Sequence, residues 1–374
     1  FDRIVMNPPF SLKDWGHGDF AAGDPYERFS FGMPRSDNGD YAWMQQVVKS
    51  LKPTGRAIVV MSQGILFRDQ PAQTMEVDGR NEKAGPEYVI RESFIKSDLI
   101  ECVIVLPSKL FYGNSVPACL VVVNKRKDAA RKNKILMIWA GREEHCQKDN
   151  PQNFLRRADC LRILVPWRAY GDLAKCTDLI PRHEEELIAA IRRECDSALR
   201  GIDEAYGGFL APLFDLRKEL AERTGLADQE PPKDKAELKK FREAKRANTE
   251  RLKVLRAYIK ELAKLEEEAE AKRTDARNAA EREIVFVRET TADLVRICAD
   301  SREAARYFVL SERPEIEENE FNLNVPRYVD TFAPEQRVDI EAAMAAFETA
   351  SDNSLHKRQE LRELLQMNGA TTRE

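Results

Sequence analysis

The chain has 374 residues, of which 33% are charged, and its formal net charge is −4. This length allows two domains, or one large domain with an extension, and a substantial buried core. The acidic balance is not that of a protein coated in nucleic acid, although local basic patches can still bind DNA. No apolar run approaches the roughly 18 residues of a membrane span. The seven cysteines contain no C-x-x-C pair and the four histidines share no helical spacing, so we expect no metal site, no disulfide framework and a cytoplasmic location.

The first predicted strand is the apolar run at residues 4–6, which we expect to be buried on both faces of a sheet. Pro8 and Pro9 end it at Asn7, because proline has no backbone N–H for the sheet ladder. The Asn7 carboxamide should therefore lie at the carboxyl end of a parallel strand, where open α/β sheets bind their ligands. Phe10 follows at a turn.

The Asn7-Pro8-Pro9-Phe10 motif suits chemistry on an amine that is conjugated with an aromatic ring. Such an amine is a poor nucleophile, because its lone pair is delocalised. The Asn7 side-chain oxygen and the Pro8 carbonyl are two acceptors that can draw the nitrogen towards tetrahedral geometry, and Phe10 can stack on an extruded base. The alternative is a strand that ends in a proline-rich turn, but this combination of residues is rare by chance.

Residues 11–40 predict a long loop with interleaved aromatics, which either touches the target strand or is a partly disordered surface segment. Asp40 is the predicted N-cap of a helix over 41–51. A strand over 57–61 follows, and then two helices separated by a charged loop near 76–86.

Two further strands, at 100–106 and 118–123, should pair antiparallel, because the segment between them is too short for a crossover helix. Phe111 lies in that segment, at the same edge of the sheet as Asn7. It is either a site residue or a core aromatic under the loop. An edge strand is predicted over 135–139.

From about residue 182 the apolar residues take a helical spacing, first in two helices of which the second ends at Gly225. After Pro232 a long charged segment predicts one arm of a coiled coil. Its seam consists of Leu238, Phe241, Lys245, Asn248, Leu252, Leu255, Ile259 and Leu262. We expect an antiparallel hairpin, since one chain carries both arms.

Residues 233–260 hold eleven Lys and Arg against four Asp and Glu. Such a helix can lie on phosphate. The alternative is a solvated coiled-coil surface, which the acidic run at 266–268 favours. Alanine-rich helices near 335–350 and 354–367 are predicted to dock on a partner.

The motif Asn7-Pro8-Pro9-Phe10 resembles the catalytic motif of adenine-N6 DNA methyltransferases. Other stretches narrow the resemblance to the modification (M) subunit of type I restriction-modification systems: GDYAW at 39–43, LKPTGRAIVV at 51–60, LPSKLFYG at 106–113 and, most diagnostic, NLNVPRYV at 322–329. The resemblance covers roughly 1–182 and 302–333. The helical segment between them is not part of the usual pattern.

The resemblance implies an α/β fold, the carboxyl-terminal part of a Rossmann-like methyltransferase sheet with a long coiled-coil extension. It divides the chain into a catalytic domain at 1–182, a helical coiled-coil insertion at 183–301, and a segment at 302–374 with the family motif and docking helices. Because the chain opens inside a strand, most of the cofactor site is expected upstream of Phe1, so this fragment alone should bind no cofactor and be inactive.

The implied activity is that of a site-specific, adenine-specific DNA methyltransferase, which transfers a methyl group from S-adenosylmethionine to a flipped adenine. Asn7 and Pro8 would hold the amine, Pro9 would complete the motif, Phe10 would stack, and Phe111 resembles the second aromatic near the base. Asn7 is also the one cofactor contact expected within this chain. The implied partners are double-stranded DNA, a specificity (S) subunit, a restriction (R) subunit and a second copy of the protein; no membrane is involved.

Two alternatives stay open at this stage. The same motif serves methylation of RNA bases and of amide NH2 groups in proteins, which pose the same chemical problem. The fragment could also act only as a non-catalytic assembly scaffold through its coiled coil.

Overall fold

The computed structural model describes residues 1–20, 23–71, 84–111, 117–142, 145–149, 151–227 and 229–331, together with four isolated positions further on. By its contacts the chain divides into two compact units, Phe1–Asp330 and Thr331–Glu374. The helices predicted near 335–350 and 354–367 fall almost wholly outside the described residues. The boundaries predicted near 182 and 301 stay a prediction.

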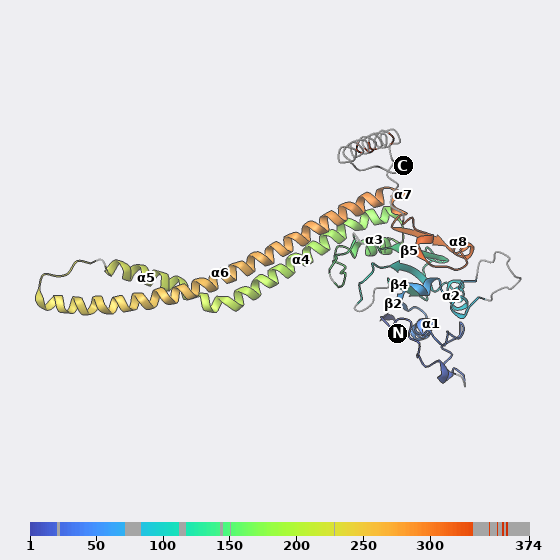
Figure 1. Cartoon of the computed structure of the whole chain (residues 1–374), viewed down its shortest axis with the longest axis horizontal. Coiled ribbons are helices and arrows are strands. Elements are labelled where there is room, and N and C mark those ends of the chain that lie inside the picture. The colour runs from blue at the N-terminus through green and yellow to red at the C-terminus, as the bar shows by residue number, and fades with distance from the viewer. Residues whose placement is uncertain are drawn as a thin grey trace, which may run out of the picture. The chain divides into compact units, whose positions relative to one another are not determined.

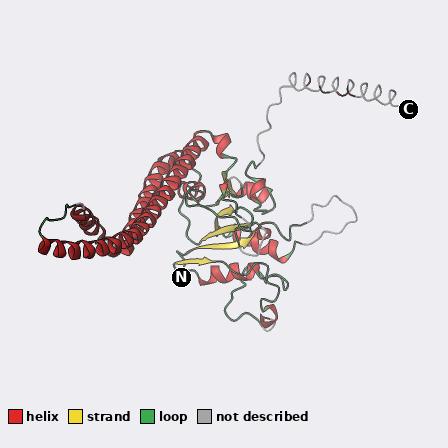
Figure 2. Ribbon diagram, turned by 60° about the vertical axis from the view of Figure 1, so that its left-hand side comes forward, coloured by secondary structure: helices red, strands yellow, loops and turns green. Residues whose placement is uncertain are grey.

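A mixed six-stranded sheet in the order β1-β2-β4-β3-β5-β6 forms the centre of the first unit (Figures 1 and 2). Its strands are β1 (Arg3–Met6), β2 (Arg56–Ser62), β3 (Ile100–Val105), β4 (Ala118–Asn124), β5 (Lys134–Trp139) and β6 (Phe308–Glu312). β1 runs parallel to β2, and β3 runs parallel to β5. β4 is antiparallel to both of its neighbours, so the predicted antiparallel pair is confirmed.

Helices cover both faces of the sheet, which explains why β3 is buried along its whole length. Successive side chains of a strand point to opposite faces; Val103 accordingly joins one core cluster and Ile104 the other. The first cluster includes α1 (Asp40–Ser50) and α2 (Pro86–Lys96). The second includes α3 (Leu161–Ala169) and the sheet-proximal ends of the two long helices.

Three sequence predictions, two about strands and one about a helix, are wrong. β1 is an edge strand that pairs only with β2 among the described strands, and the side chain of Val5 is 83% exposed, so β1 is not buried on both faces. β5 is not an edge strand, because β6 pairs with it from far along the chain. Two helices were expected after β2. The second is α2, whereas the first is, over the described residues, only the short 3-10 turn η2 (Gln63–Leu66).

The predicted antiparallel hairpin is confirmed (Figure 1). One arm comprises α4 (Leu173–Leu210) and α5 (Leu213–Ala227), and the other is the 65-residue helix α6 (Lys235–Ala299). Side-chain contacts that join Glu184 to Thr291 and Asp203 to Arg273 show that the partner number falls as the number on α4 rises. Among the described helices, none combines the length and hydropathy that a bilayer crossing requires.

Beyond the hairpin the chain returns to the sheet through α7 (Ser301–Ala304), β6, α8 (Arg313–Glu318) and the 3-10 turn η4 (Val325–Arg327). The side chains of Leu323, Val325 and Val329 are buried in the first core cluster. The NLNVPRYV segment therefore packs within the same unit as the Asn-Pro-Pro-Phe turn.

Candidate active site

Asn7 follows directly on β1, at the carboxyl end of the strand. Its side chain is exposed and makes no hydrogen bond within the described part of the chain. The next residue, Pro8, is buried, and Pro9 is exposed. The turn is thus anchored by Pro8 and leaves the Asn7 carboxamide oxygen available as an acceptor, as the catalytic interpretation requires.

The rings of Phe10 and Phe111 meet edge to face, with centroids 5.9 Å apart and planes at 73°. Phe10 follows β1, whereas Phe111 follows β3. Both rings are half-buried, and Phe111 also packs against the second core cluster, which fixes its position. The structure therefore brings together the two aromatic residues that the sequence singled out. Their contact with a base stays a prediction.

Ser11, the residue after the motif, is held by a carboxylate from α1. The Ser11 backbone has a left-handed φ of 50°, and its N–H donates to Asp40 Oδ1 at 2.7 Å. The Asp40 side chain is fully buried. Its predicted role as N-cap is wrong: Gly39 is the N-cap, no side chain caps α1, and the Asp40 carboxylate faces Ser11 instead of the first N–H groups of the helix.

Asp40 belongs to a buried polar network at the ends of β1 and β2. The Ser62 hydroxyl donates to Asp40 Oδ2 at 3.1 Å, and Arg68 forms an ion pair with the same oxygen. Arg68 Nε also donates to Glu87 Oε2 at 2.7 Å. Burial raises the pKa of the Glu87 carboxyl, and the hydrogen bond from Arg68 opposes that rise. Two buried carboxylates share one guanidinium here, so neither charge is left without a partner.

The network continues through Arg91, whose side chain is fully buried, to Phe321, the residue that precedes the NLNVPRYV segment. Arg91 donates to the carbonyl oxygens of Arg68 and Phe321, both at 2.9 Å. Close by, the Leu323 N–H donates to the Leu66 carbonyl at 2.9 Å. The most diagnostic stretch of the sequence therefore supports the backbone that carries Arg68, and through it the turn after Phe10.

The site predicted from the sequence did not include Ser62, Arg68, Glu87 or Arg91. Ser62 gave a weak signal, because it is the polar residue that ends an apolar strand. The three charged residues gave none, since their partners are distant in the sequence.

The aromatic residues of the 11–40 loop pack largely on one another. Trp15 stacks on Phe20 with centroids 6.0 Å apart, and Phe20 meets Phe29 edge to face at 4.8 Å. The Trp15 indole N–H donates to the Arg35 carbonyl at 2.7 Å. The expected contact of this loop with a target strand stays a prediction.

Of the residues in the predicted motif, the exposed Asn7 carboxamide is the group that a methyl-donor cofactor could contact at this edge of the sheet. Within the described ranges no glycine-rich turn follows a strand, so the residues present would supply only part of such a site. No cluster of three or more His, Cys, Asp or Glu side chains that could hold a metal ion occurs in the described part.

Three features are those of a Rossmann-like methyltransferase sheet: β1 is parallel to β2, the antiparallel β4 lies between β2 and β3, and an Asn-Pro-Pro-Phe turn follows β1 at the sheet edge. The N-6 DNA Methylase family matches residues 1–188. The matched region covers half of the chain, and the chain therefore belongs to the N-6 DNA methylase family.

Curated relatives confirm the resemblance to type I modification subunits. The chain is 32% identical over 143 residues to the type I restriction enzyme MjaVIII methylase subunit of Methanocaldococcus jannaschii, covering 38% of this chain and 22% of that protein. It is 31% identical over 139 residues to the HindI methylase subunit of Haemophilus influenzae, covering 37% and 27%. It thus spans about a quarter of the length of these relatives.

A solved structure with similarity to the chain is the methyltransferase subunit of a type I restriction-modification system from Streptococcus thermophilus. The sequences are 26% identical, the TM-score is 0.36, and the match covers 45% of this chain and 32% of that one.

Proposed function

We propose that the protein containing this chain is the site-specific adenine-N6 DNA methyltransferase subunit of a type I restriction-modification system. The observation that carries the proposal is the free Asn7 carboxamide at the end of β1, beside the Phe10 and Phe111 rings. Membership of the N-6 DNA methylase family supports the same conclusion.

In this proposal the Asn7 oxygen and the Pro8 carbonyl accept hydrogen bonds from the adenine amine and orient its lone pair. Phe10 and Phe111 pack against the flipped base. S-adenosylmethionine, when bound, supplies the methyl group, and Asn7 is the one residue of this chain that we assign to it. The amine is neutral when it reacts, so the motif needs no general base, and the proton can leave to water afterwards.

The similarity to type I methylase subunits supports the proposed partners. They are double-stranded DNA, a specificity subunit that selects the target sequence, a restriction subunit and a second copy of the protein. The proposal places the complex with its DNA substrate in the cytoplasm.

The test is Asn7→Ala in the full-length protein. Removing one acceptor of the amine should lower methyl transfer to DNA by about 100-fold or more, as for other polar contacts made in a transition state, while DNA affinity changes little. Asn278→Ala is the matched control, since Asn278 is exposed on α6. Normal turnover by Asn7→Ala would refute the catalytic assignment and leave the scaffold alternative.

Acceptor specificity is measured on the same preparations with radiolabelled methyl donor. We expect label in duplex DNA and none in RNA or protein. Preferential labelling of RNA or of protein amides would overturn the assignment of the substrate.

A further inference from the structure

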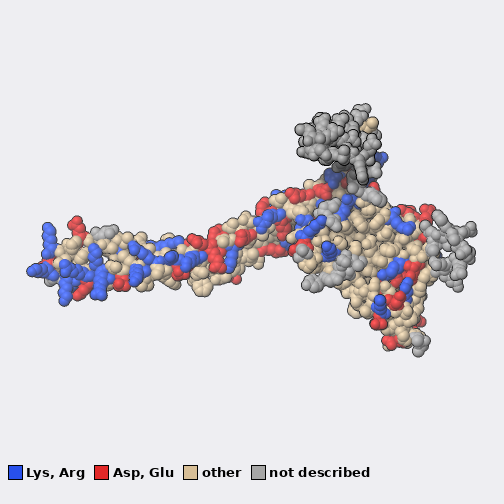
Figure 3. Space-filling model, viewed as in Figure 1, with Lys and Arg blue, Asp and Glu red and all other residues tan. Residues whose placement is uncertain are grey.

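The charge of α6 is strongly uneven along its length. Eleven Lys and Arg against four Asp and Glu occupy 233–260, whereas 261–283 holds five against eight. Figure 3 shows the result as a dense group of basic side chains at the end of the hairpin far from the sheet. Since the whole chain carries a net charge of −4, this end of the hairpin has a charge opposite to that of the rest.

Six of these cations form one row, which we name the basic stripe. The basic stripe consists of Lys235, Lys239, Arg242, Arg246, Lys253 and Lys260. Successive members are three, four or seven residues apart, which places them on one face of a helix with 3.6 residues per turn. All six side chains are exposed. The apolar seam lies on a different face, where Leu252 and Leu255 are buried.

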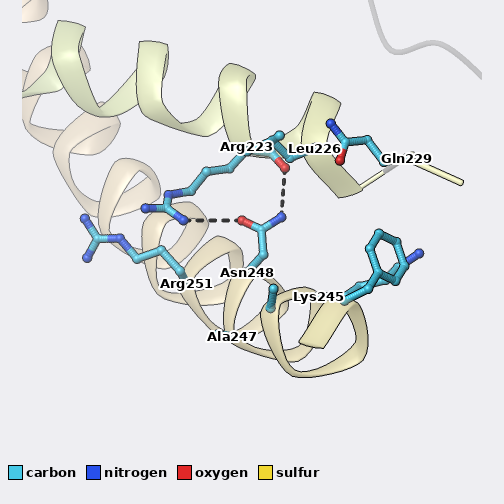
Figure 4. A pocket seen from close by; sticks show the side chains of 9 residues that line it. Arg223, Leu226, Gln229, Lys245, Ala247, Asn248 and Arg251 are labelled. Atoms are coloured by element: carbon cyan, nitrogen blue, oxygen red, sulfur yellow. Dashed lines mark hydrogen bonds between the residues drawn. The ribbon is translucent and has the colours of Figure 1, made fainter. Parts of the chain in front are cut away.

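The cations of the basic stripe form no ion pair within the described part of the chain. Neighbouring cations differ: Arg223 and Arg251, which line a cavity of about 580 Å³ between α5 and α6, both bind Glu219. Their hydrogen bonds lower the pKa of Glu219 to about 2. Arg223 also makes two hydrogen bonds with Asn248 (Figure 4): its guanidinium donates to Asn248 Oδ1, and its backbone carbonyl accepts from Asn248 Nδ2. Arg223 and Arg251 are therefore neutralised by Glu219, whereas the cations of the basic stripe have no such partner among the described residues.

We infer that the basic stripe lies along the phosphate backbone of duplex DNA. The choice of DNA rests on the proposed function, and the physical fit comes from the basic stripe itself. At 1.5 Å per residue the basic stripe extends for about 38 Å, which is close to one turn of B-DNA, about 34–36 Å. A row of unpaired cations of this length releases counterions from phosphate without reading bases.

An anionic membrane fits the basic stripe less well. Helices that bind lipid surfaces present an apolar face next to their basic face, but the apolar face of α6 is used within the hairpin by Leu252, Leu255 and Leu262. Binding to DNA phosphates requires no such face.

The test is a variant with Lys239→Gln, Arg242→Gln, Arg246→Gln and Lys253→Gln in the full-length protein. Glutamine is a good helix former and all four positions are exposed, so the hairpin is preserved. The control removes the same charge from the other arm, through Arg192→Gln, Arg193→Gln, Arg200→Gln and Lys218→Gln, which are exposed and make no ion pair within the described part. Affinity for two 30-bp duplexes of unrelated sequence is measured from low to high salt.

We expect the stripe variant to bind both duplexes at least about tenfold more weakly at low salt, with the salt slope flattened by about 0.9 for each phosphate that is no longer neutralised. The control should keep the wild-type slope. An unchanged slope in the stripe variant, or an equal change in the control, would overturn the inference. So would binding to phosphatidylserine vesicles that depends on the basic stripe while the slope on DNA stays the same.

Methyl transfer measured on the same proteins separates this inference from the proposed function. If Asn7→Ala abolishes transfer but the stripe variant keeps the wild-type slope, only the role of the basic stripe fails. If the stripe variant flattens the slope but the wild-type protein transfers no methyl group to DNA, only the proposed function fails.

Discussion

Replacing Asp40 by alanine should loosen the turn that carries the Asn-Pro-Pro-Phe motif. The substitution removes the acceptor of the Ser11 N–H and of the Ser62 hydroxyl, and it deprives Arg68 of one of its two carboxylate partners. Breaking a buried ion pair costs about 3–5 kcal/mol. Because the Arg68 side chain is 25% exposed and keeps Glu87, we expect the lower end of that range, about 3 kcal/mol.

The assay is thermal unfolding of the protein followed by tryptophan fluorescence. Asp40 lies in the compact unit Phe1–Asp330. At an unfolding entropy of about 2.1 cal/mol/K per residue, a loss of about 3 kcal/mol in a unit of this size corresponds to a fall in Tm of about 4 °C. Asp40→Asn keeps an acceptor for the Ser11 N–H but loses the charge, so its Tm should lie between those of wild type and Asp40→Ala. Asp14→Ala, at an exposed position, is the control.

Methyl transfer gives the functional readout of the same variants. A displacement of about 1 Å at a reacting group can cost 100-fold in rate, so Asp40→Ala should lose activity even at temperatures well below its Tm, and Asp40→Asn should recover part of it. A Tm for Asp40→Ala within a degree of the control would refute the reasoning. Equal Tm values for Asp40→Asn and Asp40→Ala would show that the Ser11 contact contributes nothing.

Two further predictions concern other contacts. In a double-mutant cycle with Phe10→Leu and Phe111→Leu, the edge-to-face contact should appear as a coupling of about 0.5–1.5 kcal/mol in unfolding free energy, and strictly additive effects would contradict it. Hydrogen bonds from Arg251 and Arg223 lower the pKa of Glu219 from its ordinary value of 4.5 to about 2. The ionised carboxylate therefore stabilises the α5–α6 contact fully above pH 4.5, and this stabilisation is lost as the pH falls towards 2. Acid titration of the helical circular dichroism should therefore show a smaller loss between these values in Glu219→Gln than in wild type, and identical titrations would count against the pairing.

Local sequence signals predicted the strands and helices whose pattern is continuous. The apolar runs of β2, β3 and β4 and the spacing along α4 and α6 identify those elements, because burial of a strand or of one helix face imposes its own period. The prediction that Asn7, Phe10 and Phe111 lie at one edge of the sheet required only that each follows the carboxyl end of a strand.

The remaining features depend on partners that are distant in the sequence. β6 has no clear strand pattern, and the hairpin separates it in the sequence from its partner β5. Asp40 matched a common N-cap pattern, but the half-buried Arg68 competes for its carboxylate. Lys245 occupied a seam position by spacing and is exposed, because α5 and α6 separate there enough to leave a cavity. No local pattern encodes any of these outcomes.

The pairing of Ile138 with Phe308 has a consequence for the order of events during protein synthesis. A ribosome that adds 5–20 residues per second needs on the order of ten seconds to pass from one of these residues to the other, and throughout that interval β5 offers an unpaired edge on which another nascent chain can add a strand. Closing a loop of this length without internal structure would be slow. The hairpin between these residues forms from contacts along its own two arms and brings the chain back to the sheet. Shortening both arms equally should therefore still bring β6 to β5. Shortening α6 alone should leave β5 uncovered and make the newly synthesised protein prone to aggregate.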